Sequence, residues 1–426
     1  MIRRLAPLCF IFLCTSVSWF VLGTTIDNRT QSSTERLRGR VQSVWGEPQK
    51  QMAPSAEFEV PVAYTETVEE DGKKKTVEKT KFETHFIRPR SSEVAADLQL
   101  EHRKKGLLWY STYKVGFQGE YEFRNTEQVS RKVRLTLYLP GQQAIYDDLR
   151  FLVNGDQVPV TVRGGVAYSE FDLLPDQDVK MLAGYRSQGL DSWRYNFGKD
   201  ISQVNDFHLR MSTNFKNIDF PDNTLAPSEK RETPGGWQLD WTYKNLLSGY
   251  EIALAMPEKI QPGPLASEIS FFAPVSLFFF FFLIFMITTL RGMELHPMNY
   301  FFLACAFFAF HLLLAYLVDH IDLYLSFAIS AVVSVLLVVS YLRIVVGSQF
   351  ALREAAAAQM IYLILFSVAF FFRRFTGLAI TIGSILTLFS VMQMTARIKW
   401  SERFAGVLPA GIVPPPLPRV SEELQG

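Results

Sequence analysis

Cysteine is scarce in this sequence. The 426-residue chain holds three, Cys9, Cys14 and Cys305, and all three lie in apolar runs. None falls in the polar part of the chain, so a disulfide framework there is excluded whatever the redox compartment. We expect these thiols to pack as small hydrophobic side chains.

The chain also lacks an excess of charge of either sign. Lys and Arg number 43 against 42 Asp and Glu, a formal net charge of +1. Binding to nucleic acid requires a basic surface, so this balance argues against a nucleic acid partner. Almost all charges lie between Asn28 and Lys259, whereas Ser270 to Thr395 is largely Phe, Leu, Ile, Val and Ala.

The common motifs of catalysis and cofactor binding are missing. The chain has no HExxH sequence, paired CxxC, Walker loop, GxGxxG or GxGD, and Gly383-Ser384 lacks the preceding glycine of a GxSxG elbow. We therefore predict no catalytic residue, no metal and no cofactor, and expect that the protein is not an enzyme.

Long hydrophobic runs, in contrast, are abundant. The first, Leu5 to Leu22, follows Arg3 and Arg4 and is either a cleaved signal peptide or a retained anchor. Its length exceeds the roughly 7–15 apolar residues of a signal peptide core, which favours an anchor within residues 1–26.

Five more runs approach the ~20 apolar residues that a membrane-spanning helix needs, and they predict a bundle of five helices over residues 265–403. They are Ile269–Leu290, Tyr300–Val318, Tyr324–Leu342, Ala355–Phe372 and Gly377–Thr395.

Basic residues flanking the runs predict the orientation, because cytoplasmic loops are enriched in Lys and Arg. Six spans place both chain ends in the cytoplasm and residues 27–264 outside it. Arg373 and Arg374 oppose this arrangement, because they would face outward. The proline-rich residues 404–426 are predicted to be a disordered cytoplasmic tail.

The polar region, residues 27–264, reads as a β-rich domain with a helical entrance. Ser32 to Glu35 fits the capping box that starts a helix. Alternation at Phe58, Val60, Val62 and Tyr64 predicts a strand with one buried face, and similar runs follow. Asp71-Gly72, Asn154-Gly155 and Gly164-Gly165 are hairpin turn signals between such runs. The predicted fold is an α+β membrane protein: an anchor helix, an antiparallel β-sandwich-like periplasmic domain and a five-helix transmembrane bundle.

Two aromatic clusters in this region permit two interpretations. A platform for a sugar or peptide is one, and packing between strands in the core is the other, which we favour. The clusters are Trp193, Tyr195 and Phe197, and Trp237, Trp241 and Tyr243.

Polar residues in the third apolar run form the sharpest candidate site. His311 and Asp319 share one helix face, with His320 close to the outer end. An ionisable residue inside a span is costly unless it faces the bundle interior or water. The group is either a proton or cation relay, or His311 is neutral and bonds to a neighbouring carbonyl or hydroxyl; we favour the second interpretation.

Helix-end chemistry explains the start of the same run. Pro297 suits a first helical turn, where its missing N–H is not needed, and Tyr300 suits the membrane interface. His296 precedes this proline directly. We expect these three residues to have structural roles.

Several stretches resemble the CreD family of bacterial inner-membrane proteins. Val44 to Gln49 resembles the family's SWGxxQ stretch, although Ala53-Pro54 stands where Gly-Pro is usual. His102 to Gly106, with Tyr113 and Gly119, resembles a second segment, with Lys105 in place of an arginine. Leu295 to Tyr300 matches LHPxxY, and Met392 to Trp400 resembles the terminal TRRxDWY region, with Lys399 in place of the aspartate.

The resemblance implies an inner-membrane protein associated with two-component stress regulation, envelope integrity and tolerance to colicins, with no known enzymatic chemistry. We expect the lipid bilayer and an unknown envelope protein or periplasmic ligand as partners. A proton-coupled transporter or permease that uses His311 and Asp319 is the alternative, and a tethered periplasmic hydrolase is a third possibility. No inverted repeat or paired broken helices support transport.

Overall fold

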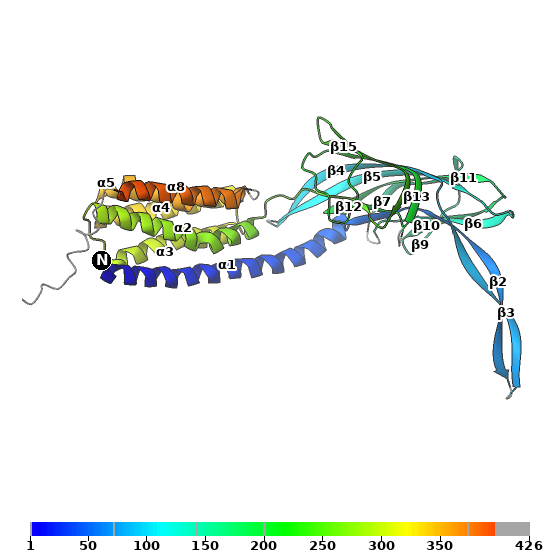
Figure 1. Ribbon diagram of the computed structural model, residues 1–426, viewed down its shortest axis with the longest axis horizontal. Coiled ribbons are helices and arrows are strands. Elements are labelled where there is room, and N and C mark those ends of the chain that lie inside the picture. Colours follow the sequence, from blue (N-terminus) through cyan, green and yellow to red (C-terminus); the bar gives the residue numbers. More distant parts are fainter. Residues whose placement is uncertain are drawn as a thin grey trace, which may run out of the picture. The chain divides into compact units, whose positions relative to one another are not determined.

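The computed structural model describes residues 2–70, 73–106, 108–141, 144–198, 202–372 and 375–396. The chain forms two compact units. One unit combines the chain up to Thr30 with the chain from Pro262 onward, and the other is Gln31–Gln261. Figure 1 shows that the first unit is helical and the second is built of strands.

Within the described residues, six helical segments are long and apolar enough to cross a membrane. Each overlaps one of the six predicted spans, so the predicted number and order are confirmed. The single helices among them are α1 (Ile2–Trp45), α2 (Pro262–Leu290), α3 (Pro297–Leu317), α4 (Leu323–Val345) and α8 (Thr376–Thr395). Arg373, Arg374 and the tail at 404–426 lie outside the described residues, so their predicted placements stay predictions.

The fifth span is irregular, and its helical geometry changes several times along its length. A π-helix has wider turns than an α-helix and leaves some carbonyl groups without their usual partner, which is why π-helices are rare and short. The carbonyl of Tyr362, in a π-helical piece of this span, accepts a hydrogen bond from the Ser276 hydroxyl on α2. The pieces are α5 (Ser348–Phe350), η1 (Ala351–Ala355), α6 (Ala356–Gln359), η2 (Met360–Leu365), α7 (Phe366–Val368) and η3 (Ala369–Phe371), of which η1 and η2 are π-helical and η3 is 3-10.

Small polar side chains join the helices of the bundle. Ser334 on α4 donates to the carbonyl oxygen of Ala306 on α3 at 2.7 Å, and Gln359 Nε2 on α6 donates to Ser334 Oγ at 2.8 Å. Both side chains are fully buried. In lipid the hydrophobic effect does not drive helices together, so small residues and such hydrogen bonds determine which helices pack.

The predicted start of a separate helix at Ser32 to Glu35 is wrong, because α1 runs without interruption from Ile2 to Trp45. A capping box marks the start of a helix only where the residues before it cannot themselves be helical. No proline stands between Pro7 and Ser32, and Gly23, the glycine in this stretch, costs about 1 kcal/mol, which a long helix tolerates. In the last part of α1, Val41 is buried against Tyr110 and Leu190.

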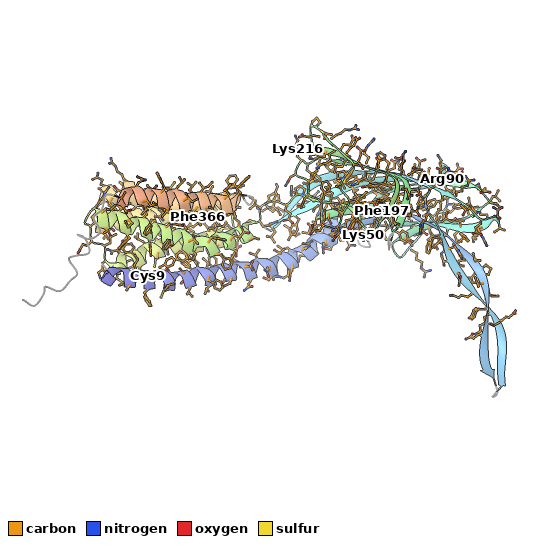
Figure 2. The ribbon with its side chains drawn as sticks, viewed as in Figure 1. Cys9, Lys50, Arg90, Phe197, Lys216 and Phe366 are labelled. Carbon is orange, nitrogen blue, oxygen red and sulfur yellow. The ribbon has the colours of Figure 1, made fainter. Side chains whose placement is uncertain are left out.

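The three cysteines are exposed on helix surfaces, not buried. Cys9 is visible on α1 in Figure 2. In a membrane an exposed apolar helix face meets lipid, so a run of hydrophobic residues does not distinguish a side chain that packs in the bundle from one that faces the bilayer.

The described residues of the β unit form three sheets. The order in the largest sheet is β14-β15-β13-β4-β5-β11-β7-β8, in the second β3-β2-β6-β10-β9 and in the third β1-β12-β16. The α+β class is confirmed, and pairing is mostly antiparallel. Two parallel pairs, β13 with β4 and β1 with β12, were not predicted. The strands are β1 (Gln49–Met52), β2 (Ser55–Glu70), β3 (Lys73–Ile87), β4 (Ser91–Lys105), β5 (Leu108–Arg124), β6 (Arg131–Tyr138), β7 (Tyr146–Val153), β8 (Asp156–Gln157), β9 (Thr161–Arg163), β10 (Val166–Leu173), β11 (Asp178–Leu190), β12 (Ser192–Asn196), β13 (Ser202–Thr213), β14 (Glu229–Glu232), β15 (Trp237–Ser248) and β16 (Ile252–Ala255).

Aromatic side chains fill the core of the β unit, as the favoured interpretation predicted. Trp193, Tyr195 and Trp241 are fully buried, and the other members of both clusters pack partly buried against the same core. The Tyr195 ring lies 5.6 Å from that of Phe207 on β13. Such packing contributes about 1.5–3 kcal/mol for each large apolar side chain that leaves water.

Two of the three predicted hairpin turns lie in the described residues and are confirmed. Asn154 and Gly155 adopt φ of 53° and 89°, and Gly164 and Gly165 adopt 61° and 81°, the positive values that such turns need. Asp71-Gly72 lies outside the described residues.

The predicted buried face of β2 is only partly correct. Phe58 is buried, but Val62 and Tyr64 are 38% and 44% exposed. The reason is that β2 and β3 form a long hairpin that extends away from the rest of the unit (Figure 1), so its outer part has no sheet to cover it.

Candidate functional site

The predicted polar residues at the start of α3 serve its geometry. His296 is the N-cap, and its Nδ1 accepts a hydrogen bond from the Met298 N–H at 3.2 Å. Pro297 is the first helical residue. Tyr300 is buried, and its ring packs edge-on against Phe281 of α2 with centroids 5.4 Å apart. These residues start α3 and fix it against α2.

His311 lies in the interior of the helical unit and is 2% exposed. Its Nδ1 lies 3.0 Å from the carbonyl oxygen of Phe307, one turn earlier in the same helix. The surrounding rings are those of Trp19, at 5.7 Å, and Phe310, at 4.9 Å between centroids. This environment is that of a histidine bonded to a neighbouring carbonyl.

Asp319 lies beyond the end of α3 and forms an ion pair with Arg29 of α1, with Nη1 and Oδ2 2.7 Å apart. Arg29 also donates to the Ala315 carbonyl at 2.7 Å. His320 is exposed at the same end. Two helical turns separate Asp319 from His311, and no hydrogen-bonded chain joins them within the described part of the helical unit. The geometry therefore does not bring the predicted relay residues together.

The β unit offers a second candidate, the outer face of the eight-stranded sheet. Strand alternation turns Val94, Ala96 and Leu98 of β4 inward, while Glu93, Ala95, Asp97 and Gln99 point outward and are exposed. Strands β15, β13, β4, β5, β11 and β7 are neighbours in this sheet. We refer to their outward side as the polar sheet face.

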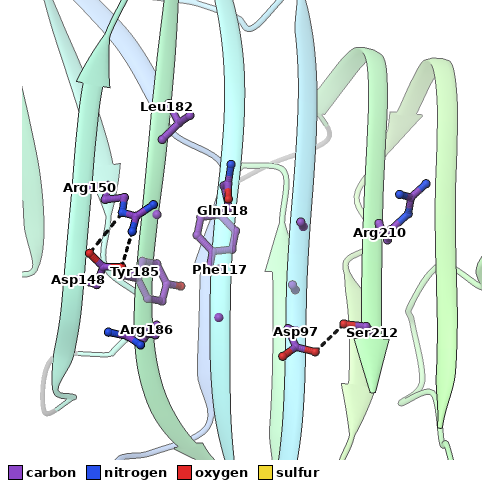
Figure 3. Close-up of a pocket in the computed structure, with 14 residues that line it drawn as sticks. Asp97, Phe117, Gln118, Asp148, Arg150, Leu182, Tyr185, Arg186, Arg210 and Ser212 are labelled. Atoms are coloured by element: carbon purple, nitrogen blue, oxygen red, sulfur yellow. Dashed lines mark hydrogen bonds and ion pairs between the residues drawn. The ribbon is translucent and has the colours of Figure 1, made fainter. Parts of the chain in front are cut away.

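Two adjoining depressions of about 360 Å³ and 400 Å³ lie on the polar sheet face. Gly116 contributes to both and pairs in register with Asp97 on one side and Arg186 on the other. Because glycine has no side chain, the surface is hollow between these two charged residues. Figure 3 shows Asp97, Arg150, Arg186 and Arg210 around the first depression.

Opposite charges are paired around these depressions. Arg150 contacts Asp148 at 2.8 Å, and Arg186 contacts Asp147 at 3.0 Å. Ser212 Oγ donates to Asp97 at 2.6 Å (Figure 3). Each of these exposed ion pairs contributes at most about 1 kcal/mol to stability. A ligand that breaks such a pair to bind the charged groups therefore loses little free energy.

The most connected carboxylate on this face is Asp240 of β15, which is 6% exposed. Arg210 Nε donates to it at 2.9 Å, and Gln238 donates at 3.1 Å. Burial alone would raise the pKa of Asp240, but the hydrogen bonds from Arg210 and Gln238 outweigh burial and hold its pKa below the usual value. His208 lies between Asp240 and Glu93, at 3.3 Å and 2.8 Å.

This arrangement does not form a nucleophile–base pair. Ser212 shares the strand of His208, but its hydroxyl is bonded to Asp97. In the residues that the structure describes, no group of three His, Cys, Asp or Glu side chains is placed to hold a metal ion. The face offers charges and hydrogen-bonding groups suited to binding.

The stretch Val44 to Gln49 joins α1 to the first strand. Gly46 ends the helix at φ 86°, with its N–H bonded to the Gln42 carbonyl. Gln49 is buried, and its Nε2 donates to Ser187 Oγ and to the Gln188 carbonyl, both at 2.8 Å. These bonds hold β1 against the end of β11.

These structural roles account for the sequence pattern of Val44 to Gln49. A comparison with protein families supports the resemblance that this pattern suggested. The family described as inner membrane protein CreD matches residues 1–186 and 201–401. The chain belongs to the CreD family. It is therefore a protein of the inner membrane, with several membrane-spanning helices and a large β domain.

Other comparisons add little to the CreD assignment. A search of curated proteins finds no match. Among solved structures, a nutrient-binding protein from Legionella pneumophila is 11% identical, covering 46% of this chain and 74% of its own, with a TM-score of 0.30. An M1 zinc metallopeptidase from Deinococcus radiodurans is 10% identical, covering 40% and 42%, with a TM-score of 0.26. Likenesses this low carry no functional argument.

Sequence reasoning missed the polar sheet face of this CreD-family protein. Its charged residues are far apart in the chain, from Glu93 to Asp240, and only strand pairing brings them together. Gly116 and Gly184, both in strand interiors, were the available signal, because such glycines often mark a close approach or a hollow.

Proposed function

We propose that this CreD-family protein helps to maintain the cell envelope by binding a periplasmic partner or ligand through the polar sheet face, without catalysing a reaction. The observation that carries the proposal is the hollow at Gly116, bordered by Asp97, Arg186 and Arg150. The association of the family with envelope integrity and stress regulation supports the biological setting.

A periplasmic location of the β unit is supported by the loop charges. Arg3 and Arg4 lie at the start of α1, Arg291 follows α2, and Arg343 lies at the end of α4. With six spans these residues share one side, and cytoplasmic loops carry such an excess of basic residues. The β unit follows the first span and therefore lies on the opposite side.

A binding role fits the chemistry of this face better than hydrolysis. Catalysis by a serine or cysteine needs a base within hydrogen-bonding reach of the nucleophile. His208 is bonded to two carboxylates, and the three cysteines are in the helical unit. Arginine and aspartate side chains around a hollow instead recognise polar or charged groups.

Complementation of a deletion strain tests this proposal. Deletion should lower tolerance to detergent and envelope stress, and the intact chain should restore it. A chain with Arg150→Glu and Arg186→Glu should not restore it, because both charges beside the depressions are reversed. Arg163→Glu, a change at an exposed arginine on β9 outside this face, is the matched control and should restore tolerance.

Two outcomes would end the proposal. One is a deletion strain as tolerant as its parent in every stress tested. The other is full rescue by the doubly charge-reversed chain at normal protein levels. If neither outcome occurs, crosslinking of the β unit in intact cells would identify the bound molecule.

A further inference from the structure

The hairpin of β2 and β3 extends well past its sheet. Pairing of β2 with β6 covers only Ser55 to Phe58, whereas β2 and β3 pair with each other from Ala56–Ile87 to Glu70–Lys73. Beyond Phe58, the described residues of the hairpin pair with no third strand. We call the hairpin from the Glu57–Phe86 pair outward the arm, and Figure 1 shows it as the long blue hairpin.

The two faces of the arm have different chemistry. Cross-strand pairs share a face, so Phe82 lies opposite Pro61, and Phe86 lies opposite Glu57. Phe82 and Phe86 are 62% and 65% exposed. The side that they share, the phenylalanine face, consists of Glu57, Glu59, Pro61, Ala63, Thr65, Glu78, Thr80, Phe82, Thr84 and Phe86.

The charges on the phenylalanine face are all negative. Glu57 is paired with Arg134, at 3.5 Å, where the arm joins the sheet. Among the described side chains, neither Glu59 nor Glu78 forms an ion pair. They lie at opposite ends of a strip that contains Pro61, Ala63 and Phe82, and Phe86 lies beyond Glu59. From Glu59 to Thr65, which pairs with Glu78, the strip is roughly 20 Å long at about 3.3 Å per residue.

The opposite face differs in that its charges are compensated. Lys79 pairs with Glu66 at 2.5 Å, and Lys81 lies 3.7 Å from Glu83. Val62 and Tyr64 are the exposed apolar residues described there. Only the phenylalanine face thus combines exposed aromatic rings with uncompensated charge of one sign.

We propose that the phenylalanine face docks a protein partner that presents apolar side chains flanked by Lys or Arg. This proposal rests on the proposed function, because it names the chemistry of a partner of the same β unit. Phe82 and Phe86 supply aromatic contact area, and Glu59 and Glu78 select basic residues on either side of the Phe82 contact. A second copy in face-to-face contact would oppose like carboxylates, and an anionic lipid surface would repel them.

Peptide binding to the full chain in nanodiscs of neutral lipid tests the proposal. The probes are two fluorescent extended peptides with the same Phe-Val-Phe centre, one flanked by lysines and the other by glutamates. The lysine peptide should bind on the order of tenfold more tightly, since one charge contact of about 1.4 kcal/mol gives that ratio. Phe82→Ser with Phe86→Ser should weaken the binding of both peptides, because these changes remove the aromatic contact area.

Val62→Ser with Tyr64→Ser is the matched control on the opposite face of the same strands, and it should leave binding unchanged. Glu59→Lys with Glu78→Lys should reverse the preference toward the glutamate peptide, a gain that loss of folding cannot produce. Equal binding of both peptides, an equal effect of the control variant, or self-association of the arm in place of peptide binding would each overturn the proposal. If the peptide test fails while the deletion strain still loses stress tolerance, the polar sheet face remains the proposed binding site. The two proposals can therefore fail independently.

Discussion

At the scale of single residues, His311 shows how a helix accommodates a polar ring in an apolar interior. Its Nδ1 is bonded to the Phe307 carbonyl and its ring packs beside Trp19. We predict that His311→Leu keeps full rescue of a deletion strain and changes the free energy of unfolding by less than about 1.5 kcal/mol, because leucine fills a similar volume. Complementation and thermal unfolding in detergent measure both. Loss of rescue by a normally folded variant would instead favour a proton-coupled permease.

Asp240 provides a prediction on pH dependence. Its pKa is lowered in the folded protein, mainly by Arg210 and Gln238 acting against burial. A lowered pKa stabilises the fold at pH above the ordinary carboxyl pKa near 4, and this stability is lost as pH falls through the folded value. Asp240→Asn should therefore destabilise by about 1–3 kcal/mol at pH 7, with a difference from the unmodified chain that shrinks toward pH 3. Unfolding followed by tryptophan fluorescence across this range checks it, and a constant difference would contradict it.

At the scale of elements, the end of α1 depends on one glycine. Gly46 has φ 86°, and a Cβ there would lie 2.6 Å from the Gln188 carbonyl oxygen. Gly46→Ala should destabilise the protein by roughly 1–3 kcal/mol, through backbone strain and this contact. Gly39→Ala, inside the same helix and with open space around it, should be neutral or stabilise by up to about 1 kcal/mol. Melting temperatures of the two variants that shift equally would refute this account.

The same elements show what could be predicted from sequence. Apolar length alone determines a span, so all six were found. Strand alternation identifies a strand but not its neighbours, which depend on contacts between distant residues. For this reason the parallel pairing of β13 with β4 was missed, and the exposure of Val62 and Tyr64 in the arm was not foreseen. The continuity of α1 was missed because a capping box reports only local preference.

At the scale of the whole molecule, the membrane topology can be tested by labelling. After Cys9, Cys14 and Cys305 are replaced by serine, Gly235→Cys lies in an exposed turn of the β unit and Ser348→Cys in the segment after α4. A membrane-impermeant maleimide, added to cells with a permeabilised outer membrane, should label the first variant only. Labelling of Ser348→Cys alone would show that the orientation is the opposite of the one predicted.

The polar residues of the membrane spans were visible in the sequence, whereas the polar sheet face exists only once distant strands have paired.

The arm has unpaired strand edges, and this has a consequence for aggregation. Unprotected edges recruit strands from other chains and can grow into amyloid. Lys79 and Lys81, in edge strand β3, are 48% and 68% exposed, and burying these charges against an incoming strand would be costly. These lysines therefore protect the edge of β3 against pairing with a strand of another chain.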